Sequence, residues 1–486
     1  MKIILLGSEE GGKTSSGNTI LRREAFELKK TAECIKKDGV VAGRKITVID
    51  TPGRKKDYLA LSTPKLYKEE VVRSVALALP GPHVLLLVIN ISCSFIAECK
   101  QAVEEHLQLF GENVWNHIIV LFTHGDELEE DITIQQHIQD EGEPLQQILQ
   151  KCGNRYHVFN NMERDDHSQV NELLEKIQEM VAGNREDHFE MDKKVLQRLI
   201  VKKKKQDKKA KDRRMLMLRP KENLRSTTDL RFVLIGHQCS GKSSVGNTIL
   251  KANKFDFRTL PMSILKKSTV AERQVTVVDT PGWQKDGLLT DTPKTSKYEI
   301  VRSVSLCAPG PHAFLLVIPV DTTFTDSDEK SIIDHLELFG DQVWSHVIVV
   351  FSHADWMGDT AIELYIESEG EGLQRLVEKC GNRYHALNNM TTGDESQVRE
   401  LLEKIEHIVT VNSGSHFEMD ANIVDKLKRE SLQEEVECEG KNQRSGTHLT
   451  EISESSGYQS SLPFSPPFSI KSSTSMDYPL TFRIWE

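Results

Sequence analysis

The sequence has few cysteines and aromatic residues and lacks any long apolar run. No apolar run approaches the length of a membrane span, so we expect no transmembrane segment and only indirect contact with membrane or lipid. The eight cysteines form no CxxC pair, and no signal peptide precedes them, which argues against a disulfide framework and a zinc site. They are Cys34, Cys93, Cys99, Cys152, Cys239, Cys307, Cys380 and Cys438. We therefore expect a reducing compartment, the cytosol.

The 486 residues are 28% charged and 38% hydrophobic, which is typical of a soluble chain with room for two domains of about 190 residues each. The net charge is −11, yet residues 193–214 hold 12 basic and 2 acidic residues. Such runs usually face water, so we interpret this one as a solvated helical linker. Its functional alternatives are binding to anionic lipid, to the acidic half of a neighbouring molecule or, least expected, to nucleic acid.

Two glycine-rich segments that begin 229 residues apart match the pattern G-x-x-x-x-G-K-[ST]. In this pattern backbone N–H groups wrap a phosphate, the Lys reaches the outer phosphates, and the hydroxyl holds Mg²⁺. Each segment follows an apolar strand and opens a helix-like stretch, the context that the motif requires. With the serine that follows, the segments are Gly7, Ser8, Glu9, Glu10, Gly11, Gly12, Lys13, Thr14, Ser15 and Gly236, His237, Gln238, Cys239, Ser240, Gly241, Lys242, Ser243, Ser244.

Most of the chain repeats at the same spacing, so we interpret it as a whole domain duplicated in tandem. The repeat includes Pro80-Gly-Pro-His83 with Pro309-Gly-Pro-His312, and a His-Phe-Glu-Met-Asp segment near residues 188 and 416. We interpret the latter as the docking of each domain's last helix. The predicted organisation is a first domain over 1–192, a basic linker over 193–229, a second domain over 230–420, and a helix remnant with a disordered Ser/Pro-rich tail over 421–486.

Asp50-Thr-Pro-Gly53 and Asp279-Thr-Pro-Gly282 each end an apolar run, which places both acids at the carboxyl end of a buried parallel strand. Open α/β sheets bind ligands at that edge. Beside a phosphate loop, the Asp would orient Mg²⁺ and its waters, and Gly53 or Gly282 would turn an N–H toward a γ-phosphate. Taken alone, an acid followed by Pro-Gly would more simply begin a turn.

A further apolar run in each half leads to Thr123-His124-Gly125-Asp126 and to Ser352-His353-Ala354-Asp355. A carboxylate at this place can accept both guanine N1–H and N2–H₂, a donor pair that adenine lacks, and the imidazole can stack on the purine. Asp126 and Asp355 would then choose the base, because the wrong base leaves a buried charge unpaired. The alternative is a helix N-cap segment, which the same residue types favour.

Together these residues resemble the immunity-associated GTPases, the GIMAP family. The marks are Gly-Asn-Thr-Ile-Leu after each phosphate loop, Asp-Thr-Pro-Gly, the Pro-Gly-Pro-His box, Thr/Ser-x-x-Asp, and Arg-Tyr-His followed by two asparagines. The resemblance covers residues 1–192 and 230–420 and implies tandem P-loop NTPase domains, each a mostly parallel sheet sandwiched by helices. It also implies GTP/GDP and Mg²⁺ as ligands, and nucleotide-dependent dimers or polymers formed through the switch face in an immune-cell setting.

Carried over by resemblance, the site residues extend beyond the phosphate loops. The Mg²⁺ hydroxyls are Thr14 and Ser243 with the switch residue Thr31, and the guanine contacts are His124, Asp126, Asn160, His353, Asp355 and Asn388. The switch Thr has no counterpart in the second half, where Leu260 stands with Thr259 beside it. We therefore expect weaker Mg²⁺-linked switching in that half. Glu9 and Glu10 should weaken anion binding unless they point to water.

Arg54 and Trp283 follow the two Asp-Thr-Pro-Gly segments, where Ras-like enzymes carry a water-orienting Gln nearby. We therefore expect GTP hydrolysis to be slow or partner-dependent. Arg54 is a candidate catalytic residue that reaches a partner's γ-phosphate, with a surface salt bridge as the alternative. Two hypotheses follow: a weak GTPase that self-assembles, or a non-enzymatic scaffold whose second domain stays nucleotide-loaded as a structural part.

Overall fold

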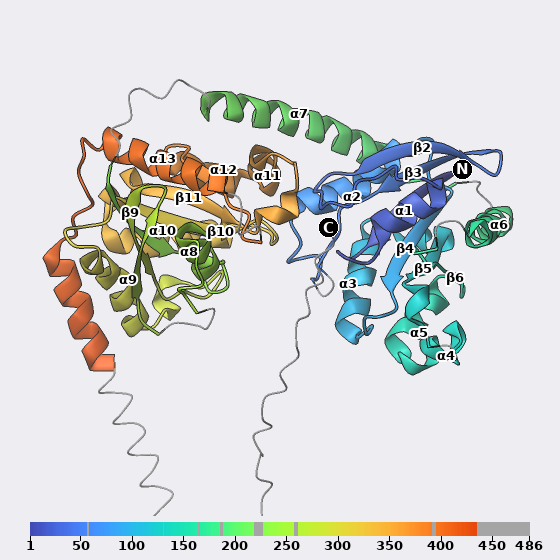
Figure 1. Cartoon of the computed structure of the whole chain (residues 1–486), viewed down its shortest axis with the longest axis horizontal. Coiled ribbons are helices and arrows are strands. Elements are labelled where there is room, and N and C mark those ends of the chain that lie inside the picture. Colours follow the sequence, from blue (N-terminus) through green and yellow to red (C-terminus); the bar gives the residue numbers. More distant parts are fainter. Residues whose placement is uncertain are drawn as a thin grey trace, which may run out of the picture. The chain divides into compact units, whose positions relative to one another are not determined.

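The computed structural model describes residues 1–55, 58–129, 131–163, 166–184, 188–217, 227–256, 261–390 and 395–434. Residues Met1–Ser431 form one unit, which contains two similar α/β domains (Figure 1). A helix over residues 421–434 is the last described element, so the expected Ser/Pro-rich tail lies outside the described residues.

The first domain is built on a six-stranded sheet in the order β2-β3-β1-β4-β5-β6. Its strands are β1 (Lys2–Gly7), β2 (Ile35–Val41), β3 (Arg44–Asp50), β4 (Val84–Asn90), β5 (Ile118–Thr123) and β6 (Tyr156–Val158). Strand β2 runs antiparallel to β3, and the other neighbours are parallel. The continuous apolar runs of β4 and β5 are buried along their length because helices cover both faces of the sheet.

The helices of the first domain pack in two layers. Helices α1 and α6 share a core with one face of the sheet, and α2, α3 and α5 share a core with the other. The helical elements are α1 (Lys13–Leu21), α2 (Lys65–Leu77), α3 (Ala97–Gln108), η1 (Glu112–His117), η2 (Gly125–Glu127), α4 (Ile134–Asp140), α5 (Glu143–Lys151) and α6 (His167–Gly183).

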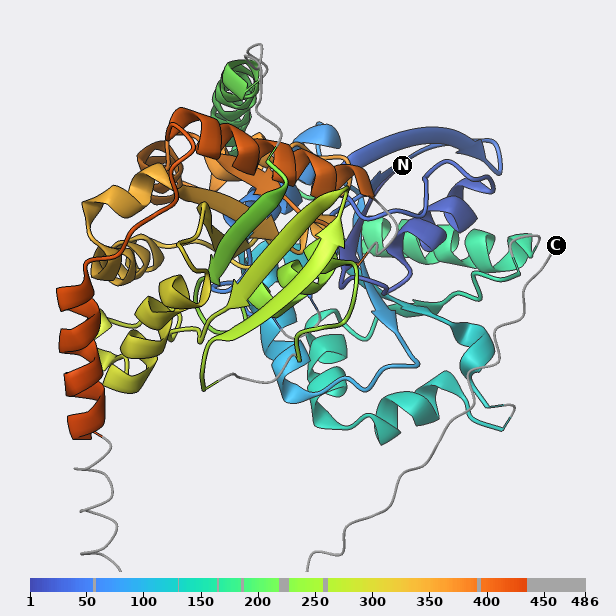
Figure 2. The same cartoon turned by 60° about the vertical axis from the view of Figure 1, so that its left-hand side comes forward.

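The second domain, whose sheet is visible in Figure 2, repeats this plan. Its strand order is β12-β11-β10-β7-β9-β8. Its strands are β7 (Asp229–Ile235), β8 (Ile264–Val270), β9 (Arg273–Asp279), β10 (Ala313–Pro319), β11 (Val347–Ser352) and β12 (Tyr384–Ala386). Its helical elements are α8 (Lys242–Leu250), η3 (Leu289–Asp291), α9 (Lys294–Leu306), α10 (Asp326–Leu336), η4 (Glu337–Phe339), η5 (Asp341–Ser345), η6 (Ala354–Met357), α11 (Ile362–Glu369), α12 (Glu371–Lys379) and α13 (Glu395–Val411). The predicted fold, a duplicated α/β domain with a mostly parallel sheet between helices, is confirmed.

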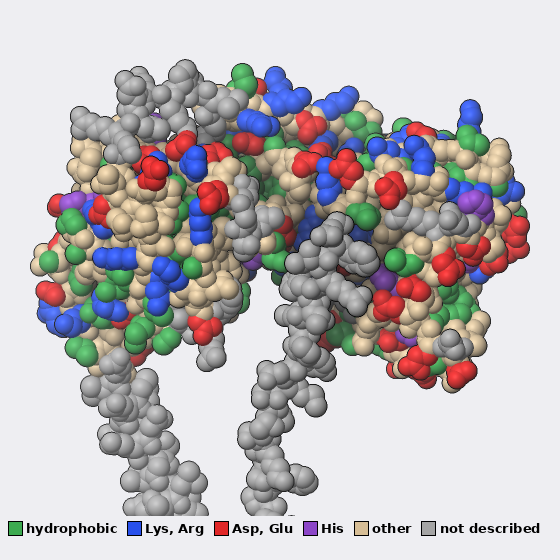
Figure 3. Space-filling model, in the orientation of Figure 1, with side chains coloured by type: hydrophobic (Ala, Val, Ile, Leu, Met, Phe, Trp, Pro, Cys, Tyr) green, Lys and Arg blue, Asp and Glu red, His purple; other side chains and the backbone are tan. Residues whose placement is uncertain are grey.

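The basic stretch forms a single helix, α7 (Lys193–Met217). One side of this helix is buried, with Leu196, Gln206, Ala210 and Arg213. Four lysines on the other side of the helix are exposed, Lys204, Lys205, Lys208 and Lys211. Figure 3 shows Lys and Arg side chains at the top of the view, where Figure 1 places α7. No helix in the described part of the chain is long and apolar enough to cross a membrane.

The repeated His-Phe-Glu-Met-Asp segments pack against the Pro-Gly-Pro-His boxes. The Phe189 N–H donates to Pro82 O at 2.8 Å, and Phe417 N–H donates to Pro311 O at the same distance. Both Phe rings are buried in the core. A Cβ atom at Gly81 would lie 2.1 Å from Phe189 O, so this approach requires glycine.

We predict that Gly81→Ala destabilises the protein by about 1–3 kcal/mol, since the methyl group would collide with a backbone oxygen that cannot rotate away. Urea unfolding followed by circular dichroism measures the change. Gly183→Ala is the control, because nothing lies within 4 Å of a Cβ atom there. Equal stabilities of the two variants would contradict the packing argument.

Candidate phosphate-binding sites

In the first domain, the phosphate loop joins the end of β1 to the start of α1. Gly12 stands at the N-cap of α1 with φ 85°, a left-handed conformation that favours glycine. A Cβ atom at Gly7 would lie 2.6 Å from Val88 O, so glycine is needed there for space. Lys13 Nζ donates to Ser8 O at 2.7 Å, across the loop. The loop therefore presents the N-terminus of a helix and a lysine together, which suits a phosphate group.

The acid at the end of β3 holds the first turn of α1. Thr14 Oγ1 donates to Asp50 Oδ2 at 2.7 Å. Asp50 is buried, and its Oδ1 atom has no hydrogen-bond partner. Burial raises the pKa of Asp50 even though Lys13 lies nearby, and burial also lowers the pKa of Lys13. An unpartnered carboxylate oxygen next to a hydroxyl is a donor set that fits Mg²⁺, which prefers oxygen ligands.

The second domain has the same arrangement. Ser243 Oγ donates to Asp279 Oδ2 at 2.6 Å, and Asp279 Oδ1 is again buried without a partner. Lys242 Nζ donates to His237 O at 2.8 Å and to Gly236 O at 3.1 Å. Burial lowers the pKa of Lys242 to about 8. Among the described residues no cluster of three or more His, Cys, Asp or Glu side chains could hold a metal ion.

A cleft of about 540 Å³ opens over the phosphate loop of the first domain. The predicted site residues Lys13, Thr14, Thr31, Asp50, His124 and Asp126 line it. The cleft is also lined by Asn161, whereas the predicted contact Asn160 is absent from its lining. Asn160 Oδ1 instead accepts a local hydrogen bond from Met162 N at 2.9 Å. The sequence places two asparagines side by side, and only the fold shows that Asn161 is the one that lines the cleft.

The second domain shows the same division between its two asparagines. Asn388 Oδ1 accepts from Met390 N at 2.9 Å, while Asn389 Oδ1 accepts from His353 N at 3.0 Å. Asn389 thus contacts the segment that carries Asp355, the predicted base-selecting acid.

The segment that carries each predicted base-selecting acid, Asp126 or Asp355, is hydrogen-bonded to its phosphate loop. Thr123 Oγ1 donates to Gly11 O at 2.9 Å, and Ser352 Oγ donates to Ser240 O at 2.6 Å. A 3₁₀-helix begins after each histidine, and no side-chain hydrogen bond caps it, so helix capping does not account for these residues. Asp126 is exposed at the cleft, but Asp355 is half-buried and its Oδ2 atom accepts from Lys30 Nζ at 2.8 Å.

The residues after the Asp-Thr-Pro-Gly segments pair with the phosphate loops through their backbones, Arg54 with Ser8 and Trp283 with His237. Arg54 is 7% exposed, and its carbonyl oxygen accepts from Glu9 N at 2.7 Å. Trp283 is buried and stacks on His335, with ring centroids 4.4 Å apart. A surface salt bridge, the alternative for Arg54, does not fit this burial. Its catalytic role stays a prediction, and it requires Arg54 to leave this position.

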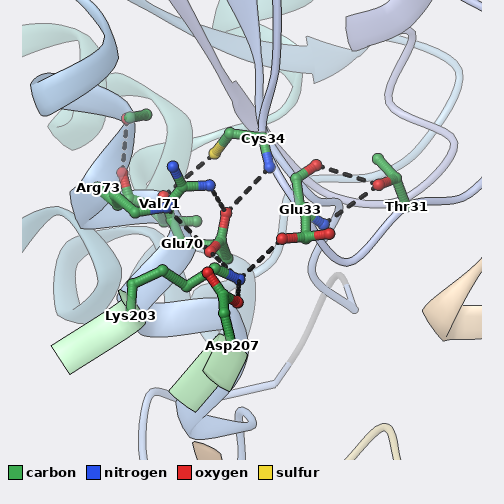
Figure 4. Close-up of polar contacts among 9 residues, drawn as sticks. Thr31, Glu33, Cys34, Glu70, Val71, Arg73, Lys203 and Asp207 are labelled. Atoms are coloured by element: carbon green, nitrogen blue, oxygen red, sulfur yellow. Dashed lines mark hydrogen bonds and ion pairs between the residues drawn. The ribbon is translucent and has the colours of Figure 1, made fainter. Parts of the chain in front are cut away.

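The predicted switch segment is joined to α2 and α7 by a polar network (Figure 4). Thr31 Oγ1 accepts from Glu33 N at 3.1 Å, and Cys34 N donates to Glu70 Oε2 at 3.1 Å. Lys203 Nζ lies 2.7 Å from Glu33 Oε1 and 3.2 Å from Glu70 Oε1.

Burial would raise the pKa of Glu70, but Arg73 and Lys203 outweigh it, and the pKa falls below its usual value. Glu70 and Lys203 could not be recognised as part of this network from the sequence, because neither stands in a nucleotide-binding motif. In the second domain, the corresponding switch positions Thr259 and Leu260 lie outside the described residues.

The sequence matches the model of the AIG1 family over residues 1–210 and 230–436, one stretch for each domain. The chain belongs to the AIG1 family. It is 29% identical over 437 residues to GTPase IMAP family member 8 of Homo sapiens and 30% identical over 429 residues to that of Rattus norvegicus. These alignments cover 86% and 84% of this chain, and 63% and 60% of the relatives' own length.

The immune-associated nucleotide-binding protein 9 of Arabidopsis thaliana is 36% identical over 199 residues, which is 37% of this chain and 55% of that protein. The resemblance to the GIMAP family with two G domains is thereby confirmed. The first stretch of the AIG1 match ends at residue 210, so it includes most of α7.

Proposed function

We propose that the chain is a GTP/GDP-binding protein of the immunity-associated GTPase type, with a Mg²⁺ site in each G domain. The observation that carries this proposal is the duplicated contact of a phosphate-loop hydroxyl with a buried Asp, Thr14 with Asp50 and Ser243 with Asp279. In each pair the second carboxylate oxygen has no partner. Bound Mg²⁺ would neutralise charge on the phosphate oxygens. The names of the mammalian relatives, GTPase IMAP family member 8, support the proposal.

In this proposal the domains occupy residues 1–192 and 230–420, joined by the basic stretch 193–229. Thr31 and Gly53 would complete the phosphate end of the first site, and Gly282 would complete that of the second. The seven described cysteines are free thiols, which supports a reducing compartment such as the cytosol.

Asp126 and Asp355 would select guanine. We predict that Asp→Asn at either position shifts that site from guanosine to xanthosine diphosphate, because the 2-oxo group of xanthine reverses the required hydrogen-bond partner. Titrations of each variant with fluorescent GDP, XDP and ADP measure the preference. An Asn variant that keeps its preference for GDP would rule out base selection by that residue.

Lys242 should make nucleotide binding in the second domain depend on pH. Its pKa in the free site, about 8, is below the ordinary 10.5, so the ammonium is present below pH 8 and is lost above it. Since phosphate binds the charged form, we predict that affinity falls by about tenfold from pH 7 to pH 9. Lys242→Arg, which stays charged throughout, should give a flat profile. A flat profile for the unchanged protein would contradict the assignment.

We propose that hydrolysis is slow in the monomer and depends on self-assembly, because neither Arg54 nor Trp283 can orient a water molecule as an amide does. We predict that the rate per molecule rises with protein concentration, and that Arg54→Ala removes this rise. An inserted cation contributes roughly 10³–10⁵-fold in assisted GTPases. Single-turnover hydrolysis over a dilution series measures the effect, and a fast rate that is constant on dilution would overturn the proposal.

A second candidate function is a guanine-nucleotide scaffold without turnover in its second domain. The specific observation that favours it is the ion pair of Asp355 with Lys30, which occupies the base-selecting acid of that domain. Single-turnover hydrolysis with Asp126→Asn, in which GTP reports on the second domain alone, separates the two functions. Turnover there excludes the scaffold.

A further inference from the structure

The base-selecting acid of the second domain is bound to the switch segment of the first. Lys30 Nζ lies 2.8 Å from Asp355 Oδ2 and 3.4 Å from Glu9 Oε2. The Asp355 side chain is 16% exposed, and its Oδ1 atom is buried without a partner. Burial lowers the pKa of Lys30, but the carboxylates of Asp355 and Glu9 outweigh this and raise it above its usual value.

The backbone at this contact is closely packed. Gly358 has φ 53°, and a Cβ atom there would lie 2.0 Å from Lys30 O. Trp356, in the same 3₁₀-helix as Asp355, lines the cleft of the first domain. At the rim, Lys29 Nζ lies 2.5 Å from Asp359 Oδ2, but these side chains are 44% and 82% exposed.

A second buried acid extends the contact to α2. Helix α2 begins after Pro64, which supplies no side-chain cap. Glu369, at the end of α11, accepts from Lys65 N at 2.6 Å with Oε1 and from Phe324 N at 3.0 Å with Oε2. Its side chain therefore supplies the missing acceptor at the start of α2 while it holds its own domain's loop. The second domain thus contacts the first domain at two places, at residues 29–31 beside the cleft and at the start of α2.

Guanine and Lys30 require the same atoms of Asp355. A carboxylate that accepts both N1–H and N2–H₂ of guanine uses both oxygens, yet Oδ1 is closed to solvent and Oδ2 is occupied by Lys30. Asp126, its counterpart, lies open at the first cleft. The two domains are therefore unequal although their motifs match.

We propose that guanine nucleotide in the second domain and Lys30 of the first domain compete for Asp355, so that filling the second site releases residues 29–31 beside the first cleft. This inference rests on the proposed function of both sites. Linkage makes the effect reciprocal, so a change in the first domain that breaks the Lys30 contact and leaves Asp355 in place strengthens guanine nucleotide binding at the second site.

The test uses the full chain with Asp126→Asn, in which XDP reports on the first site and GDP on the second. We expect Lys30→Gln in this background to tighten GDP binding by about fivefold or more, the range typical of site coupling. Lys29→Gln is the matched control, since it removes the same charge from an exposed ion pair and should change affinity by less than about twofold. Loss of positive charge alone would weaken binding of an anion, so tightening is diagnostic.

Hydrogen exchange provides a second measurement that does not depend on the Lys30 variant. In the Asp126→Asn chain, GDP should increase exchange at the amides of residues 29–31, and the additional change Asp355→Asn should abolish this increase. Equal GDP affinities with and without Lys30→Gln, or exchange that GDP leaves unchanged, would overturn the inference. If the Asp126→Asn chain binds neither GDP nor XDP, the proposed function fails instead.

Discussion

The hydrogen bond between a phosphate-loop hydroxyl and a buried Asp is the contact on which both sites depend. It joins the first turn of α1 to the last residue of β3, and the first turn of α8 to the last residue of β9. Because β1, β3, β4 and β5 are parallel, their carboxyl ends meet at one edge of the sheet. The other polar segments of the site arrive at this edge and are positioned by the loop that the hydrogen bond holds.

The two domains share this hydrogen bond, but the contacts around the two sites differ. Glu141 Oε2 accepts from Phe95 N at 2.5 Å, as Glu369 Oε2 accepts from Phe324 N in the second domain. Glu369 also accepts from the start of α2, and burial raises its pKa. A buried carboxylate is costly unless hydrogen bonds satisfy it, and these N–H donors supply them. Glu141 therefore binds within its own domain, whereas Glu369, at the equivalent position, joins the two domains.

The basic helix α7 shows why a charge run is a poor guide to burial. Its buried side includes the polar residues Gln206 and Arg213. The regular spacing of apolar residues that identifies a packed amphipathic helix is therefore weak in this sequence. Arg213 Nε donates to Glu367 at 2.8 Å, which compensates for its burial. The interpretation as a solvated linker describes only the exposed side of the helix.

The sequence by itself determined the apolar parallel strands, the two phosphate loops, the acids at the strand ends and the duplication, but not the antiparallel strands β2 and β8 or the short strands β6 and β12. These features depend on apolar runs, on glycines and on residues close in the chain, whose backbone geometry follows from local chemistry. Only the tertiary structure decided that Asn161 lines the cleft instead of Asn160, that Arg54 is buried, and that Asp355 is bound to Lys30. Such contacts join segments as many as 325 residues apart. They depend on which surfaces pack together and exclude water, and a local sequence pattern does not predict that packing.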